Sequence, residues 1–282
     1  MRNIEAIIRS VEKLPPFPVA VQRAMEILDD TDASVSELIS VIKYDQAITA
    51  NVLKLCNSAY YGLRRKVHSL RDGLVLLGND ELKDIILAGT VVEFFQQENK
   101  GYELAMGELW RHAIATAIIS KIISDNVLDS ENHSVFTAAL LHDIGKVVLG
   151  SFVEQYFEQM FSLVFEKECS FTEAETEILG INHAEVGGKI AELWLFPEDI
   201  VQAIRLHHDP GKASDDDHVT PIVYLANIIT LSMGIGVGCY GLSCRGRQEI
   251  MKRYRLRAKD LERMMVTFYD KYHAIQDIFK LN

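Results

Sequence analysis

The sequence predicts an all-α fold in the form of a multi-helix bundle. Its apolar residues recur three and four positions apart, the spacing that places side chains on one face of a helix. The pattern is clearest in Ile4, Ile7, Ile8 and Val11 and in Leu38, Ile39 and Ile42. The sequence shows no sustained alternation with a period of two, which would indicate half-buried strands.

Two segments carry the chemistry of a helix start. Ser34 and Glu37 have the spacing of a capping box, in which two side chains accept hydrogen bonds from otherwise unpaired backbone amides. Thr172 and Glu175 have the same spacing. We therefore expect helices to begin at both places.

Two interruptions divide the chain. Prolines at positions 15, 16 and 18 break it after the first helix, because proline has no amide hydrogen to donate. The polar interval QQENKG at residues 96–101 then separates two helical sets, and the second set holds most of the nine histidines. We expect an N-terminal helical module at residues 1–100 and a histidine-rich helical module at residues 101–282.

The net charge of −11 argues against general binding to nucleic acid, which requires a positive surface. Residues 245–259 are a local exception, with seven basic side chains and one acid. We interpret this stretch as a solvated helix face, and a basic stripe that binds a nucleotide or nucleic acid is the alternative.

The four cysteines form no CxxC pair and no signal peptide is recognisable, so we expect a reducing cytoplasm and no disulfides. Residues 219–244 carry no charged side chain and are long enough to span a bilayer. The same stretch contains Pro221, Asn227 and four glycines. These residues favour a buried helix that ends in a glycine-rich loop, and we expect no membrane span.

The N-terminal module carries a distinctive pattern. LPPFP at residues 14–18 precedes YDQAITANVLKLCNSAYYGLRRKVHSLRDGLVLLG at residues 44–78. This combination of a proline-rich entry, an Asn-Ser-Ala-Tyr-Tyr-Gly turn and a basic segment closely resembles the HDOD family. The resemblance extends over roughly residues 5–235 and implies a signalling module that contacts other proteins.

The same pattern contains a basic cluster at Arg64, Arg65 and Lys66, with Arg71 nearby. Arginine pairs with carboxylates through two parallel hydrogen bonds, so the cluster suits an acidic partner surface. Turn formation and packing by the neighbouring Asn, Ser and Tyr residues are an equally good explanation of the segment. We expect the three basic side chains to be exposed.

The second module contains a set of histidines and carboxylates. In order these are Glu108, His112, His142, Asp143, His183, His207 and His208. Glu108 and His112 are four residues apart and share one helix face, so both can point at one ion. Imidazole with carboxylate suits iron, manganese, zinc or nickel, and we expect one or two such ions.

In sequence order this set resembles the HD superfamily, and above all its HD-GYP branch of phosphohydrolases. The resemblance implies that these seven residues are metal ligands, that Asp143 belongs to the catalytic centre of an active enzyme, and that Lys146 contacts a substrate phosphate. Two departures stand out. The last ligand of the pattern is an Asp on a later apolar helix, where this chain has Asn227, and the Gly-Tyr-Pro loop is missing after His208.

These residues and the resemblance are consistent with two alternative functions. The first is a regulatory protein that acts through protein contacts and keeps a metal site of reduced or absent activity. The second is a metal-dependent phosphohydrolase acting on a nucleotide or cyclic dinucleotide, in which a bound metal activates a water molecule. Because a catalytic site needs every group in place, the departures favour the first.

The histidine pattern predicts that purified protein binds at least one transition metal ion per chain. His142→Ala should lower the metal content, because it removes one neutral nitrogen ligand. Elemental analysis is the measurement, and His133→Ala and His273→Ala, which lie outside the pattern, should leave the content unchanged. Wild-type protein that carries no metal and takes up none on titration would contradict the ligand assignment.

Overall fold

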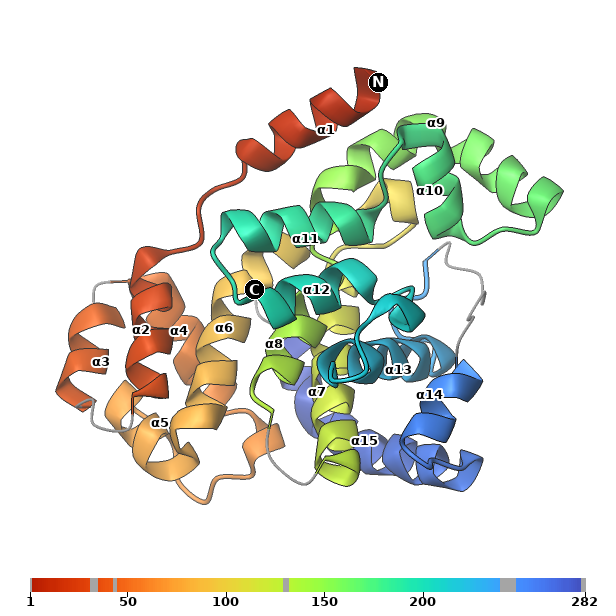
Figure 1. Ribbon diagram of the computed structural model, residues 1–282. Coiled ribbons are helices and arrows are strands. Elements are labelled where there is room, and N and C mark those ends of the chain that lie inside the picture. Colours follow the sequence, from red (N-terminus) through yellow and green to blue (C-terminus); the bar gives the residue numbers. More distant parts are fainter. Residues whose placement is uncertain (1, 31–34, 43–44, 129–131, 239–246, 280–282) are drawn as a thin grey trace. The chain divides into compact units, whose positions relative to one another are not determined.

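The computed structural model describes residues 2–30, 35–42, 45–128, 132–238 and 247–279 (Figure 1). Within these ranges the regular structure is helical, and extended backbone pairs only at an isolated bridge between Asn99 and Leu104. The predicted all-α fold is confirmed.

The chain divides into two compact units. Unit 1 comprises residues 1–15 and 94–266, and unit 2 comprises residues 16–93 and 267–282. The change of unit at residue 94 lies near the module boundary expected at residue 100. The two ends of the chain fall on opposite sides of that expected division, since residues 1–15 group with the second half and residues 267–282 with the first.

Unit 2 is built mainly from five α-helices and one short 3-10 helix. They are α2 (Val19–Asp29), α3 (Val35–Ile42), α4 (Gln46–Cys56), η1 (Ala59–Tyr61), α5 (Leu70–Leu77) and most of α6 (Asn79–Phe95). The side chain of Asn51 on α4 donates to the carbonyl of Gly89 on α6 at 3.0 Å. Lys83 on α6 pairs with Asp29 at the end of α2. These polar contacts link helices that are distant in sequence.

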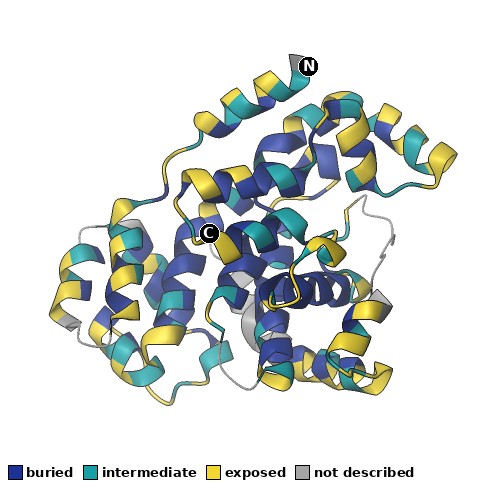
Figure 2. Ribbon diagram, in the orientation of Figure 1, coloured by how far each residue is buried: buried dark blue, intermediate teal, exposed yellow. Residues whose placement is uncertain are grey.

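Unit 1 contains the remaining helices. They are α1 (Arg2–Glu12), η2 (Lys100–Tyr102), α7 (Glu108–Val127), α8 (Ser134–Leu141), α9 (Gly145–Lys167), α10 (Phe171–Leu179), α11 (His183–Leu193), α12 (Glu198–Leu206), η3 (Pro210–Lys212), α13 (Val219–Ser232), α14 (Arg247–Arg253) and the first part of α15 (Ala258–Phe279). Helices α7 and α13 are buried over most of their length and pack on each other (Figure 2). They form the centre of the unit.

The first part of the uncharged stretch, Val219–Ser232, forms a buried helix, as predicted. Helix α13 ends at Ser232, and Gly234, Gly236 and Gly238 follow with φ angles of 75°, 60° and 49°. Residues 239–244 lie outside the described ranges. A second apolar stretch, residues 134–167, is long enough to cross a membrane, but 78% of its most apolar window is buried inside the protein. That degree of burial is typical of core helices.

One predicted helix start is wrong. Helix α10 is capped by Ser170, whose side chain accepts from the Glu173 amide while Glu173 accepts from the Ser170 amide. The earlier start buries Phe171 in the first turn and leaves Glu175 inside the helix, on its buried side. Hydrophobic burial therefore decides between two overlapping capping patterns. The other expected start, at Ser34, lies outside the described residues.

The basic stretch at residues 245–259 is solvated where the structure describes it. Lys252, Arg253, Arg255, Arg257 and Lys259 are all exposed. Arg253 donates to the carbonyls of Asp215 and Asp217, and Arg257 pairs with Asp260. The interpretation as a solvated face holds for these five residues, and Arg245 lies outside the described ranges.

Gly145 permits the close approach of α9 to α11. A methyl group on its Cα would lie 1.9 Å from the carbonyl oxygen of His183 and 2.7 Å from the amide nitrogen of Gly187. Both are backbone atoms of α11, so neither can rotate away. The close packing of these two helices therefore requires a glycine at position 145, two residues after Asp143.

We expect Gly145→Ala to lower the free energy of unfolding by about 1–3 kcal/mol or more, because the added methyl group forces two backbones apart. Thermal denaturation of the variant and wild type is the measurement. Gly211→Ala is the matched control, since its methyl group would meet no atom closer than 4.0 Å. Equal melting temperatures for Gly145→Ala and wild type would contradict this packing.

Candidate metal centre

Seven polar side chains converge inside unit 1 from five segments of the chain. They are His112 on α7, His142 and Asp143 between α8 and α9, His183 at the start of α11, His207 and His208 after α12, and Asn227 on α13. All except the partly exposed His208 are buried. The fold thus brings together seven of the eight residues predicted as ligands.

Helix ends aim two of the histidines. His142 follows the last residue of α8, and its Nδ1 lies 2.7 Å from the carbonyl oxygen of Ala139. His207 follows α12 in the same way, with Nδ1 2.7 Å from the carbonyl oxygen of Ile204. The last carbonyls of a helix lack partners within it, so each imidazole satisfies one of them and is held in a fixed orientation.

Hydrogen bonds also fix which ring nitrogen carries the proton. The Nδ1 of His112 lies 2.9 Å from the carbonyl of Ile235, and that of His183 lies 2.7 Å from Glu175 Oε2. Carbonyl and carboxylate oxygens only accept, so Nδ1 must donate in His112 and His183, as in His142 and His207. In a neutral ring Nε2 then carries a lone pair and no proton in all four histidines, and that of His183 lies 2.8 Å from His208 Nε2.

These four Nε2 atoms face one carboxylate. Asp143 Oδ2 lies 3.6 Å from His112 Nε2 and 3.4 Å from His142 Nε2. Asp143 Oδ1 lies 3.5 Å from His183 Nε2 and 3.7 Å from His207 Nε2. Two ligands of one transition metal ion, each bonded at about 2.0–2.2 Å, lie roughly 3–4 Å apart, so the spacing fits a shared ion.

Buried atoms without partners support the same conclusion. Among the described residues, His142 Nε2, His207 Nε2 and Asp143 Oδ1 are buried and have no hydrogen-bond partner. Leaving such atoms unsatisfied costs free energy of about 1–3 kcal/mol each. A cation placed between the lone pairs would satisfy all three.

The potential ligand atoms fall into two groups that share Asp143. One group is His112, His142 and Asp143, and the other is Asp143, His183, His207 and His208. Within each group the ligand atoms lie within 4.8 Å of one another. A carboxylate shared in this way suits one ion or two neighbouring ions.

Burial keeps four of the five imidazoles neutral. It lowers the pKa of His142 to about 4, lowers the pKa of His112, and places the pKa values of His207 and His208 well below their usual range. Burial alone would raise the pKa of Asp143, yet the neighbouring Lys146 ammonium holds that pKa well below its usual range. The site therefore offers neutral nitrogens and one anionic oxygen, the forms that bind metals.

Lys146 contacts Asp143 directly. Its Nζ lies 2.7 Å from Asp143 Oδ2, and the side chain is buried over the ring of Tyr102. The ammonium offsets the charge of the buried carboxylate. The structure thus places Lys146 beside the predicted ligands, where the sequence pattern expected a phosphate-binding residue.

Asn227 belongs to the cluster, whereas Glu108 lies outside both groups of ligand atoms. Asn227 Oδ1 lies 3.0 Å from His112 Nε2, so the amide is part of the cluster. Both atoms accept hydrogen bonds in these forms, so this pair requires a cation between them or an amide turned to donate its NH₂ group. Glu108 lies in neither group of ligand atoms, and its carboxylate accepts from the Ala105 amide at 2.8 Å.

Glu175 is a functional candidate that the sequence did not indicate. Its side chain is fully buried and accepts from Nδ1 of His183 at 2.7 Å, from the His183 amide at 2.9 Å and from the Tyr102 hydroxyl at 2.7 Å. A carboxylate behind a ligating histidine fixes its tautomer and makes its other nitrogen more basic. From the sequence we assigned Glu175 to a helix cap, because nothing in the local pattern around position 175 indicates a contact with residue 183.

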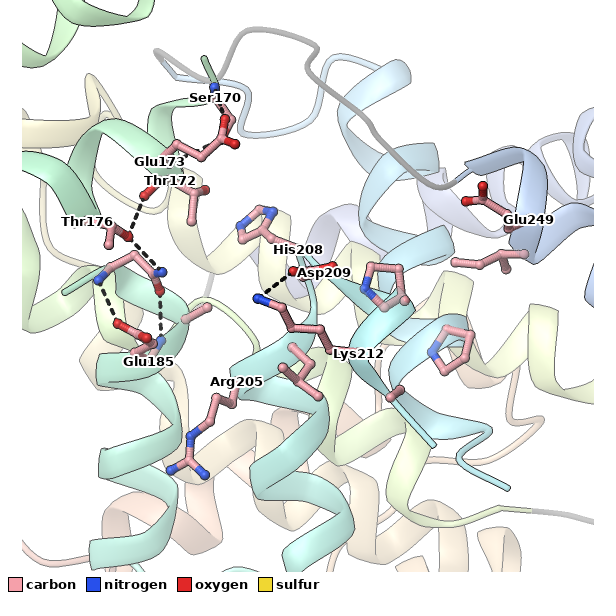
Figure 3. Close-up of a pocket in the computed structure, with 18 of the residues that line it drawn as sticks. Ser170, Thr172, Glu173, Thr176, Glu185, Arg205, His208, Asp209, Lys212 and Glu249 are labelled. Atoms are coloured by element: carbon pink, nitrogen blue, oxygen red, sulfur yellow. Dashed lines mark hydrogen bonds and ion pairs between the residues drawn. The ribbon is translucent and has the colours of Figure 1, made fainter. Parts of the chain in front are cut away.

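A pocket of about 920 Å³ opens over His208 (Figure 3). The N-termini of α10 and α11 form one wall, and η3 and α14 form the other. Its three basic side chains are engaged: Arg205 with Glu192, Lys212 with Asp209, and Arg253 with two carbonyls. Through His208 the pocket connects the buried cluster with solvent.

We expect Glu175→Gln to weaken metal binding by about 10- to 100-fold, because an amide is a poorer acceptor for His183 Nδ1. Titration of metal-free protein with Mn²⁺ or Zn²⁺ measures the dissociation constant. Glu173→Gln, an exposed position on the same helix, is the control. Unchanged affinity in Glu175→Gln would show that this carboxylate has only a packing role.

Comparisons with known proteins agree with this architecture. A Geobacter sulfurreducens structure, an HDOD domain protein of unknown function, is 26% identical, with a TM-score of 0.79 over 99% of this chain and 100% of its own. A Shewanella amazonensis structure named as a candidate phosphohydrolase is 22% identical, with a TM-score of 0.74 over 98% and 97% of the two chains. At that identity the likeness shows the fold alone.

A curated relative from Treponema pallidum, described as uncharacterized, is 26% identical over 216 residues. The match covers 74% of this chain and 40% of the relative's length. The model of the HDOD domain matches residues 14–210, which includes most of both predicted modules and the histidines up to His208. The chain belongs to the HDOD domain family.

Proposed function

We propose that this chain is a cytoplasmic regulatory protein that relays a signal through contacts with other proteins. Its buried histidine cluster binds one or two divalent ions of iron, manganese, zinc or nickel, with reduced or absent hydrolytic activity. The observation that carries this proposal is the composition of the cluster. It contains five imidazoles and an amide but a single carboxylate, Asp143, among the described residues.

Because the cluster has few anionic groups, both its affinity for a divalent metal ion and its capacity for hydrolysis are limited. The charge of Asp143 is already offset by Lys146 at 2.7 Å, so little negative charge remains to stabilise a dication. Asn227 contributes a neutral oxygen in contact with His112, and an amide cannot accept a proton from an attacking water. A site of this kind suits a structural or sensory ion better than a hydrolytic one.

The pocket over His208 offers little to a phosphate. Helix N-termini attract anions, but those of α10 and α11 are already occupied by the carboxylates of Glu173 and Glu185 in capping boxes. The three basic side chains of the pocket are held by acids or carbonyls of the protein. These contacts support the regulatory function over hydrolysis of a nucleotide.

A basic loop in unit 2 is the surface that we assign to a partner. Gly62 has φ of 56°, and Asn57 holds the far end of the loop by accepting from the Val67 amide and donating to its carbonyl, both at 2.8 Å. Arg64, Arg65 and Lys66 between these points are exposed. An exposed basic loop that is held at its far end by these hydrogen bonds suits an acidic partner surface.

The second candidate is a metal-dependent phosphohydrolase acting on a nucleotide or cyclic dinucleotide. The cluster's imidazoles and the names of relatives from Shewanella amazonensis favour it. In that case a bound ion would lower the pKa of a water molecule to generate the nucleophile. Asp143 and Lys146 would then orient the reacting groups.

Charge reversal tests the partner surface. We expect Arg64→Glu with Arg65→Glu to reduce recovery of crosslinked acidic partners from cells, because like charges then face each other. Lys252→Glu with Arg255→Glu is the matched control, since it reverses two exposed basic residues on another segment. Equal loss in both variants, or no loss in either, would contradict a specific contact at this loop.

Asn227→Asp tests the composition of the cluster. The added negative charge should tighten Mn²⁺ or Zn²⁺ binding by about tenfold or more and introduce some hydrolysis of an activated phosphodiester. Metal titration and a panel of phosphodiesters, including a cyclic dinucleotide, are the measurements. Fast, metal-dependent turnover of any member of the panel by the unmodified protein would overturn the regulatory proposal.

A further inference from the structure

The second half of α9 presents an aromatic stripe to solvent. Phe157, Phe161 and Phe165 are four residues apart and therefore share one helix face. Their ring centroids are 5.9 Å and 4.8 Å apart along the stripe. Phe157 also contacts Phe171 of α10, whereas Phe161 and Phe165 are 44% and 68% exposed.

Two adjacent exposed phenylalanines require an explanation. Scattered apolar side chains are normal on a protein surface, but contiguous apolar groups rimmed by polar residues mark interaction sites. Phe161 and Phe165 lie in the last two turns of α9 and are exposed within unit 1, so this surface is accessible to a partner.

One border of the stripe is acidic. Glu154, Glu158 and Glu166 are exposed, and they lie on one row along the helix, each one residue after a position of the phenylalanine row. The single base in this segment, Lys167, already pairs with Glu177 at 2.6 Å. A partner that complements this surface brings positive charge to one side of an apolar face, and an anionic lipid surface would be repelled.

We infer that the aromatic stripe docks an amphipathic helix of a partner protein, with an apolar face bordered on one side by Lys and Arg. Such a helix lays its apolar side chains at three- and four-residue spacing against the phenylalanines while its basic residues meet the carboxylates of Glu154, Glu158 and Glu166. The inference rests on the proposed function, since it names the chemistry of a partner. It concerns a different surface from the basic loop of unit 2.

The test uses a fluorescently labelled 18-residue Leu/Lys peptide that forms an amphipathic helix. Phe161→Gln with Phe165→Gln should weaken its binding by about tenfold or more, because aromatic anchors carry most of the affinity at interfaces. Glu158→Lys with Glu166→Lys should also weaken binding and reduce its dependence on salt. Leu193→Gln with Leu195→Gln, which removes two other exposed apolar side chains, should leave the affinity unchanged.

Circular dichroism of each variant confirms that the fold is retained. Equal affinity of the phenylalanine variant and wild type, or equal binding of a Leu/Glu peptide, would overturn the inference. Binding to phosphatidylglycerol vesicles through the stripe would assign it to a membrane, and dimerisation lost in the phenylalanine variant would assign it to a second copy. Each result is independent of charge reversal at Arg64 and Arg65, so failure here leaves the proposed function standing.

Discussion

The burial of the Asp143 carboxylate is the constraint on which the site depends. A carboxylate with 1% of its surface exposed needs compensation, because an unpaired buried charge is very costly. Lys146 supplies a positive charge, and the Nε2 atoms of four imidazoles lie 3.4–3.7 Å from the carboxylate oxygens. Since those imidazoles donate through Nδ1 to other oxygens, they present lone pairs to Asp143. Only a cation or extra protons would make that arrangement favourable.

The same constraint explains the surrounding architecture. The histidines come from helix ends and a helix interior in four segments, so their positions depend on close helix packing. Gly145 lets α9 approach α11, and Glu175 with Tyr102 holds His183 from behind. The Asn99 side chain donates to the carbonyl of Lys146 at 2.9 Å, which ties the segment after α6 to the residue beside Asp143. A small displacement of this segment would therefore change the positions of the side chains in the cluster.

Much of this could be predicted from the sequence, because it depends on local patterns. Helical periodicity gave the fold class, and the His-Asp pair with its later histidines indicated a shared site. The residues that hydrogen-bond the ligands and hold them in place could not be predicted from the sequence. Glu175 meets His183 only because α10 and α11 pack together, and the choice of Ser170 over Thr172 as a cap follows from the burial of Phe171. The placement of Glu108 outside both groups of ligand atoms likewise depends on a local bond to Ala105.

In metal-free protein the cluster holds an ionised Asp143 and neutral imidazoles at His112, His142, His207 and His208, because burial lowers the pKa values of these histidines and Lys146 lowers that of Asp143. Calorimetric titration of metal-free protein with Mn²⁺ at pH 7, repeated in buffers of different ionisation enthalpy, counts the protons released on binding. The lowered pKa values of the buried histidines and of Asp143 predict well under one proton per ion. Release of two or more protons per ion would show that the ligands are protonated before binding and would contradict the account.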